Sequence, residues 1–322
     1  MKEKCLQVLY AVLVGAMLPI LVVQLCKPPI QPLELQQTKP SETATQPALN
    51  KKIQVLLPTE ETVTMDLQDY LVGVILAEMP TSYALPALQS QAIVARTYAL
   101  KRQGEGRHPG GAICTDSECC QAYVAENTYL DGLGFPQDIE IAAEAVKTTK
   151  DLVLTYGGAL IEATYFHCSG GRTEEAVAVW GVDYPYLQSV DSPGEEEMEH
   201  YQDTVAFTKE ELEKLLGREL SGTPKSWIGW TTYTTGGGVD RMYFAGKAYE
   251  GVQLRKLLKL YSTAFTMEAT QSGIQVTTLG KGHRVGMSQS GAQAMALQGK
   301  QYEQILLHYY PGTRIDKMED VG

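Results

Sequence analysis

The sequence predicts an α+β protein, because segments with helical and with strand periodicity are mixed along the chain without a regular βαβ rhythm. Helical spacing of apolar residues is clear over 66–78 and 86–104, whereas 152–166 has the pattern of a hairpin. The chain has 322 residues, of which 44% are hydrophobic and 20% charged, as in an ordinary globular protein. This length suits one large folded domain or two small ones.

The N-terminal segment 5–26 contains no charged residue, and a helix of roughly 20 apolar residues crosses the hydrocarbon core of a membrane. We therefore expect residues 1–26 to form one uncleaved transmembrane helix. A cleaved signal peptide is the alternative, but no small-residue cleavage site follows the run. Lys2 and Lys4 predict a cytoplasmic N-terminus, with the remainder of the chain outside the cytoplasm as a single-pass protein of the cell membrane.

Residues 27–50 are rich in Pro, Gln and Thr and are expected to form a flexible linker. The folded body is then 51–322. It should open with a hairpin of the β-branched runs 52–58 and 61–65. Asp66 is a candidate N-cap for the helix that reaches Glu78.

The remaining elements follow from local signals. Pro86 should open a helix whose alanines allow close packing and which ends at Gly104, and 138–149 should form another. Gly157 and Gly158 suit the two-residue turn of a hairpin over 152–166. Further segments are expected as a capping-box helix at 208–216, a hairpin within 243–249, a helix at 251–260, strands at 265–270 and 274–280, and a last helix ending near Tyr310.

Glu78 is a candidate general acid. It ends an amphipathic helix on the side of Val74 and Ile75, and a carboxyl group in partly apolar surroundings has a raised pKa, as a general acid near neutral pH requires. The residues alone favour the alternative, a surface glutamate of the helix.

His108, Cys114 and Cys120 follow one another with five intervening residues each time. This spacing is not that of a zinc knuckle, and it leaves a zinc site, a disulfide and free thiols open. Cys114 could form a disulfide with Cys119 or Cys120, since the body is expected outside the cytoplasm.

Two loops of small residues, HCSGG and GHRVGMSQSGA, carry hydroxyl, amide and imidazole groups. Such loops allow a polymer to approach the backbone closely, although they also occur as plain turns. The net charge of −11 argues against nucleic acid as a partner, because phosphate binding requires clustered Lys and Arg.

Taken in order, four stretches resemble the stage II sporulation protein D family, membrane-anchored lytic transglycosylases of endospore-forming bacteria. They are LVGVILAEMPTSYALPALQSQAIVARTYAL, HPGGAICTDSECCQAY, SGGRTEEAVAVWGVDYPYLQSVDSP and GHRVGMSQSGAQAMA. The resemblance spans about 52–310, and the fixed order makes it more specific than any single motif. It implies that 51–322 is a catalytic domain with helices and an antiparallel sheet around a glycan-binding cleft.

The resemblance implies roles for particular residues. Glu78 stands at the position of the family's catalytic acid/base. His108, Cys114 and Cys120 match a zinc-binding pattern of some members, with zinc either structural or near the active site. Residues expected to contact the glycan are Arg96, Gln121, Tyr123, Ser169, His283, Ser288 and Gln289.

This chain departs from the family pattern in three places. Position 119, often His, is Cys; the residues before SGG, usually Ser and Thr, are His167 and Cys168; and Arg284 replaces a usual Gly. The first two departures leave Cys119, Cys168 and water as candidates for the fourth zinc ligand.

The implied reaction is cleavage of the MurNAc-β-1,4-GlcNAc bond during engulfment. One acid protonates the glycosidic oxygen, and the muramyl 6-hydroxyl attacks to give 1,6-anhydro-MurNAc, so no second carboxylate is required, unlike in a hydrolase. The expected substrate is glycan strands whose peptides have been removed, and the expected partners are a cell-wall amidase and a membrane protein of the engulfment machinery.

Two other functions are alternatives to this activity. A noncatalytic glycan-binding scaffold or amidase activator would not require an acid at Glu78. A zinc hydrolase is disfavoured, because two of three expected ligands are thiolates and no general base stands at a metalloprotease spacing.

Overall fold

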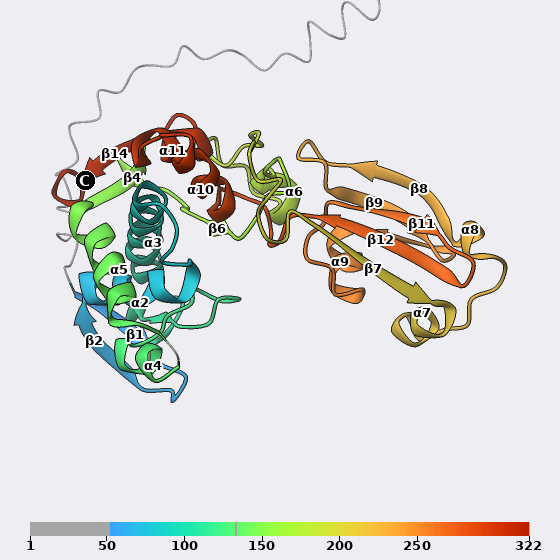
Figure 1. Ribbon diagram of the computed structural model, residues 1–322, viewed down its shortest axis with the longest axis horizontal. Coiled ribbons are helices and arrows are strands. Elements are labelled where there is room, and N and C mark those ends of the chain that lie inside the picture. The colour runs from blue at the N-terminus through green and yellow to red at the C-terminus, as the bar shows by residue number, and fades with distance from the viewer. Residues whose placement is uncertain (1–51, 133, 322) are drawn as a thin grey trace, which may run out of the picture. The chain divides into compact units, whose positions relative to one another are not determined.

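The computed structural model describes residues 52–132 and 134–321 (Figure 1). The expected transmembrane helix at 1–26 and the linker at 27–50 lie outside these residues. Within the described ranges, no helix combines the length and the apolar character needed to cross a membrane. Helices and small, mostly antiparallel sheets are mixed, which confirms the α+β class.

The larger hydrophobic core is built around helix α3 (Leu85–Glu105). This helix contacts four other helices: α2 (Leu67–Glu78), α5 (Pro136–Thr148), α10 (Gln289–Leu297) and α11 (Tyr302–Tyr309). Its alanines at 87, 92, 95 and 99 are fully buried, because small side chains allow neighbouring helices to approach closely. Helix α2, which carries Glu78, is thereby fixed against a rigid centre.

Three small sheets border this core. The first has the order β2-β1-β3, with β1 (Lys52–Leu56), β2 (Thr62–Asp66) and β3 (Ile113–Cys114). The second has the order β14-β4-β5, with β4 (Leu152–Tyr156), β5 (Ala159–Leu160) and β14 (Arg314–Lys317). The third pairs β6 (Tyr165–Phe166) in parallel with β13 (Met287–Ser288). The short helices α4 (Glu126–Asp131) and α6 (Ala176–Trp180) lie in the intervening segments.

A second, smaller core lies within 202–279. One of its sheets has the order β11-β12-β7, with β7 (Gln202–Thr208), β11 (Phe265–Ala269) and β12 (Gly273–Leu279); the other has the order β10-β9-β8, with β8 (Ile228–Tyr233), β9 (Val239–Phe244) and β10 (Lys247–Glu250). Helices α7 (Lys209–Leu216), α8 (Pro224–Trp227) and α9 (Gly251–Leu257) complete this part.

Several expected elements are confirmed. Asp66 caps α2 by accepting a hydrogen bond from the Gln68 N–H at 2.8 Å. Thr208 and Glu211 form the expected capping box. Helix α3 continues one residue beyond Gly104, and Gly106 supplies the left-handed C-cap at φ 64°.

Two expectations about elements were wrong. The second strand of the 152–166 hairpin stops at Leu160, because Tyr165 and Phe166 pair with Met287 and Ser288 from the far end of the chain. Most of the small-residue stretch after Met287 is the buried helix α10, not a loop.

Candidate active site

Glu78 lies in the wall of a cavity of about 940 Å³. The cavity is also lined by residues that are far apart in the sequence, among them Cys120, Tyr165, Trp180, His283 and Gln289. All four stretches that resemble the family, including the one that carries Glu78, therefore meet in one place.

The carboxyl group of Glu78 receives two hydrogen bonds on one oxygen atom. The backbone N–H of Ala122 donates to Oε1 at 2.8 Å, and the Tyr165 hydroxyl donates to the same oxygen at 3.2 Å. This arrangement leaves Oε2 as the oxygen that can carry an acid proton.

Burial raises the pKa of Glu78 above its usual value, and the bonds from Ala122 and Tyr165 and the nearby Gln289 side chain lower it in part. Burial disfavours the charged carboxylate, while the two donors stabilise it after proton loss. A raised pKa favours the protonated form that a general acid requires, and the donors favour the carboxylate that a general base requires.

Tyr165 was not among the residues expected from the sequence. Its hydroxyl also lies 3.1 Å from Oε1 of Gln121, whose Nε2 donates to the Tyr70 hydroxyl at 2.9 Å. Burial raises the pKa of Tyr165 well above its ordinary value, so the phenol stays protonated and can donate. The hydroxyl has a single proton, which Oε1 of Gln121 and Oε1 of Glu78 share as acceptors. The sequence carried no local signal for these contacts.

The segment that carries Ala122 packs directly on helix α2. The Tyr123 ring stacks on Tyr70 with centroids 5.5 Å apart, and the Val124 N–H donates to the Gly73 carbonyl at 3.2 Å. A Cβ atom at Gly73 would lie 2.4 Å from the Tyr123 ring. Glycine at this position is therefore required for the loop to bring Ala122 within reach of Glu78.

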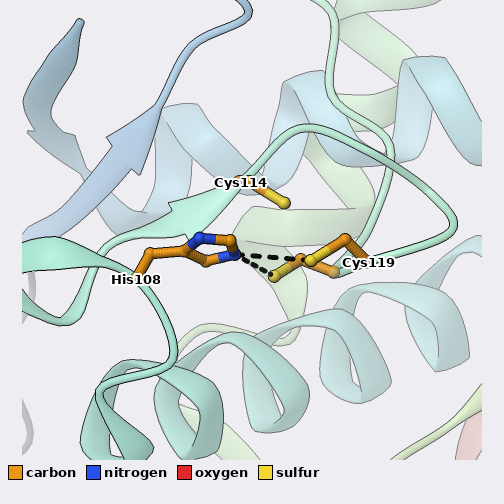
Figure 2. A group of neighbouring side chains, drawn as sticks. His108, Cys114 and Cys119 are labelled. Carbon is orange, nitrogen blue, oxygen red and sulfur yellow. Dashed lines mark hydrogen bonds between the residues drawn. The ribbon is translucent and has the colours of Figure 1, made fainter. Parts of the chain in front are cut away.

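The second feature of the cavity wall is a cluster of one histidine and three cysteines. Potential ligand atoms of His108, Cys114, Cys119 and Cys120 all lie within 4.8 Å of one another. Figure 2 shows the labelled side chains of His108, Cys114 and Cys119 converging on one point. Nε2 of His108 lies 3.4 Å from Sγ of Cys119 and 3.5 Å from Sγ of Cys120.

The donor set fits zinc. Three thiolates and one imidazole form a common structural zinc site, and ligands at about 2.1 Å and 2.3 Å in tetrahedral geometry lie roughly 3.6 Å apart. The nitrogen-to-sulfur separations agree with this value, and all four cysteines of the described residues are free thiols. Cys119, left open by the sequence, belongs to the cluster, whereas Cys168 does not.

Cys168 lies instead in a buried network around Glu195. Oε2 of Glu195 accepts hydrogen bonds from the Ser169 hydroxyl at 2.7 Å and the Gly170 N–H at 2.9 Å, and Oε1 accepts one from the Ser288 hydroxyl at 2.5 Å. Ser169 and Ser288 are both fully buried. They hold the two small-residue loops together and do not reach the cavity, contrary to the direct glycan contact expected.

Other expected contact residues also have supporting positions. Arg96 is fully buried, and its guanidinium donates to the carbonyls of Leu152 at 3.0 Å and Val146 at 3.3 Å, so the expectation of a glycan contact is wrong for this residue. Burial lowers the pKa of Arg96 to about 10. Gln121 is enclosed beneath Tyr165, and Tyr123 is outside the cavity lining.

His283 and Gln289 do line the cavity, as expected of residues that contact a ligand. Nδ1 of His283 accepts a hydrogen bond from the Val285 N–H at 3.1 Å. Burial and the nearby Arg255 lower the pKa of His283 to about 4, which keeps the ring neutral. Nε2 of Gln289 is buried and makes no hydrogen bond within the described residues, yet the amide is near enough to Glu78 to lower the pKa of that carboxyl group.

Arg284 explains how this chain tolerates the loss of a glycine. Its φ is 66°, a conformation that favours Gly. Its guanidinium donates to the carbonyls of Ser169 at 2.7 Å, Arg172 at 2.6 Å and Gly236 at 2.9 Å, and pairs with buried Glu174 at 3.4 Å. These interactions offset the backbone strain.

The cavity also contains a carboxylate that the sequence did not single out. Glu162 is 5% exposed and forms an ion pair with Arg102. Burial raises the pKa of Glu162, and the Arg102 charge opposes this effect. An ion pair of this kind holds the carboxylate in place and reduces its ability to act as a free base or nucleophile.

Comparison with known proteins gives one consistent family. A family model described as "Stage II sporulation protein" matches residues 58–156. Stage II sporulation protein D of Bacillus subtilis is 36% identical over 259 residues, which cover 79% of this chain and 75% of that protein. The protein of the same name from Bacillus amyloliquefaciens is 35% identical over the same shares. The amidase enhancer of Bacillus subtilis is 29% identical over 76% of this chain and 40% of its own length.

Proposed function

Because this chain belongs to the stage II sporulation protein D family, we propose that it is a lytic transglycosylase that cleaves MurNAc-GlcNAc bonds of peptide-free peptidoglycan strands during engulfment. The observation that supports this activity most strongly is the environment of Glu78. A half-buried carboxyl group with a raised pKa lines a cavity and receives hydrogen bonds from Ala122 and Tyr165.

In the proposed reaction, Glu78 first acts as the general acid and gives its proton to the glycosidic oxygen. The bond between this oxygen and the anomeric carbon of MurNAc breaks. The resulting carboxylate, stabilised by Ala122 and Tyr165, then takes the proton of the muramyl 6-hydroxyl as that oxygen attacks the anomeric carbon. Glu78 thus donates one proton and takes one back, and the product ends in 1,6-anhydro-MurNAc.

The position of Glu162 bears on the choice between this reaction and hydrolysis. A hydrolase requires a second carboxylate that activates water or attacks the sugar. Glu162 is the buried carboxylate of the cavity lining, and its ion pair with Arg102 holds it in place, although burial raises its pKa. Two exposed carboxylates, Glu105 and Glu118, also line the cavity, and Glu105 pairs with the same Arg102. The pairing of Glu162 and Glu105 with Arg102 supports a reaction in which Glu78 acts alone.

We propose that zinc binds the cysteine and histidine cluster as a structural ion. His108, Cys114, Cys119 and Cys120 would supply all four ligands, which leaves no coordination position for substrate. Ala122 follows Cys120 by two residues, so this site would fix the loop whose N–H contacts Glu78.

The apolar segment 5–26 supports the further proposal that the chain is anchored in the cell membrane, with the body outside the cytoplasm. We also propose a cell-wall amidase and a membrane protein of the engulfment machinery as partners. An amidase would supply the peptide-free strands on which this activity depends.

A noncatalytic role is the second candidate, because one relative is named an amidase enhancer. In that case the cavity would bind glycan without cleaving it, and Glu78 would be dispensable for the effect on the amidase.

The deciding experiment is incubation of the protein with peptide-free glycan strands, followed by mass spectrometry of the products. We expect glycan products whose MurNAc end is lighter by one water molecule than a reducing MurNAc end. The variant Glu162→Gln should give the same products. Reducing MurNAc as the product, lost in Glu162→Gln, would identify a hydrolase. Intact strands, together with a faster amidase in the presence of the protein, would identify the noncatalytic role.

A further inference from the structure

A second group of metal-binding side chains lies apart from the cysteine cluster. Ligand atoms of His167, Glu199 and His200 all lie within 4.8 Å of one another. His167 directly follows strand β6 and lines the same cavity as Glu78. His200 and Glu199 belong to the segment that leads into strand β7.

The His200 ring is already oriented as a metal ligand. Its Nδ1 lies 3.1 Å from Oδ2 of Asp203, so that the carboxylate fixes the Nδ1–H tautomer and leaves Nε2 as the donor. A histidine that binds a metal through one nitrogen usually gives its other N–H to such a carboxylate or carbonyl. His200 is held at φ 61°, an unfavourable conformation for a residue other than glycine.

The separations suit one shared ion. Nε2 of His200 lies 3.2 Å from Oε1 of Glu199, and two ligand atoms about 2.1 Å from a tetrahedral zinc ion lie roughly 3.4 Å apart. Nε2 of His167 is buried and has no hydrogen-bond partner among the described residues. A buried ring nitrogen without a partner is costly unless something binds it.

We propose that His167, Glu199 and His200 form a second metal site, which takes a divalent ion of the zinc type. Two imidazoles and one carboxylate are a ligand set of zinc sites that keep an open position for water or a ligand oxygen. Glu199 and Asp203 bring two carboxylates to the His200 ring, beside the neighbouring cation Lys281. A glycan oxygen could fill the open position of this site, and this part of the proposal rests on the proposed function. Metal binding itself does not depend on that function.

The test counts zinc on the full-length protein after equilibrium dialysis. The unchanged protein and a control variant, His308→Gln, should each bind one zinc ion more per chain than His200→Gln or Glu199→Gln. His308 is a suitable control because it lies outside the cluster, where Nε2 contacts the Asp191 carbonyl at 2.7 Å. Glu199→Gln guards against misfolding, since the Glu199 side chain is 80% exposed.

Cobalt substitution identifies which site is lost. The variants should keep the sulfur-to-cobalt charge-transfer absorption of the cysteine cluster and lose absorption from a site without sulfur. Equal zinc content in all four proteins would overturn the proposal, and so would a matching loss of the sulfur band in the variants. Neither readout requires glycan cleavage, so failure here is distinguishable from failure of the proposed transglycosylase activity.

Discussion

The backbone N–H of Ala122 lies 2.8 Å from Oε1 of Glu78, across 44 positions of sequence. The contact joins the end of helix α2 to the loop that carries the cysteine cluster. A backbone donor cannot rotate away as a side chain can, so the position of the loop determines how well the carboxylate is stabilised. The cluster and the acid are thus coupled through Gln121 and Ala122.

Removing the second donor to this oxygen should change the pH profile of the reaction. In Tyr165→Phe the carboxylate loses one hydrogen bond, so the pKa of Glu78 rises further. A general acid works while protonated, so the alkaline limb of the rate should move to higher pH by about one unit, since a hydrogen bond to a charged group contributes about 1.5–3 kcal/mol. Rates of strand cleavage measured against pH would show the shift.

The matched control is Tyr123→Phe, because Tyr123 stacks on Tyr70 and makes no hydrogen bond to Glu78. Its profile should stay where it is in the unchanged protein. An unmoved alkaline limb in Tyr165→Phe would show that this hydroxyl does not act on Glu78.

Loss of zinc should both destabilise the loop that carries Ala122 and lower the rate of strand cleavage. Metal bound by the folded state alone adds stability, so Cys119→Ser should lower both zinc content and the melting temperature. Cleavage should fall as well, because Ala122 is then less firmly held. Metal analysis, thermal unfolding and strand cleavage on the same preparations give the three values.

Cys168→Ser is the matched control, since Cys168 lies 3.4 Å from Glu195 and outside the cluster. It should retain all its zinc. Loss of zinc in Cys168→Ser, together with full retention of zinc in Cys119→Ser, would show that Cys168 and not Cys119 is the fourth ligand.

His283 should make stability depend on pH. Its pKa is lowered from 6.5 to about 4 in the folded protein, so below pH 6.5 the unfolded chain takes up a proton that the folded protein does not. The contribution of the neutral His283 ring to the free energy of unfolding is therefore complete above pH 6.5 and is lost as the pH falls toward 4. Its upper limit is about 3 kcal/mol.

Thermal or denaturant unfolding at several pH values should show a smaller loss between pH 6.5 and 4 in His283→Asn than in the unchanged protein. The comparison of the two slopes removes the effect of other groups that titrate in this range. Identical slopes would contradict the assignment of a neutral His283 ring in the folded protein.

The sequence was informative where a signal is local. The cap at Asp66, the capping box at Thr208 and the double glycine at 157–158 each stand beside the element that they specify. The candidate acid and three of the four proposed zinc ligands came from motifs that are themselves short. These features needed no knowledge of distant contacts.

Contacts between distant segments could not be predicted in this way. Tyr165 reaches Glu78 across 87 positions, and β6 pairs with β13 over an even longer separation. Glu195 lies in the acidic run EEEMEH, which has the composition of a solvated loop, yet it is fully buried by the two serine loops. Strand β7 was missed because most of its residues are at least partly exposed and give no clear alternation.

The most direct test of the central claim is the cleavage rate of Glu78→Gln on peptide-free glycan strands, measured beside strand binding by the same protein. Glutamine keeps the size of the side chain and can still accept from Ala122 and Tyr165, but it has no proton to transfer. We expect cleavage to fall roughly 10²-fold or more with binding retained. Unchanged cleavage by Glu78→Gln would contradict the assignment of Glu78 as the general acid.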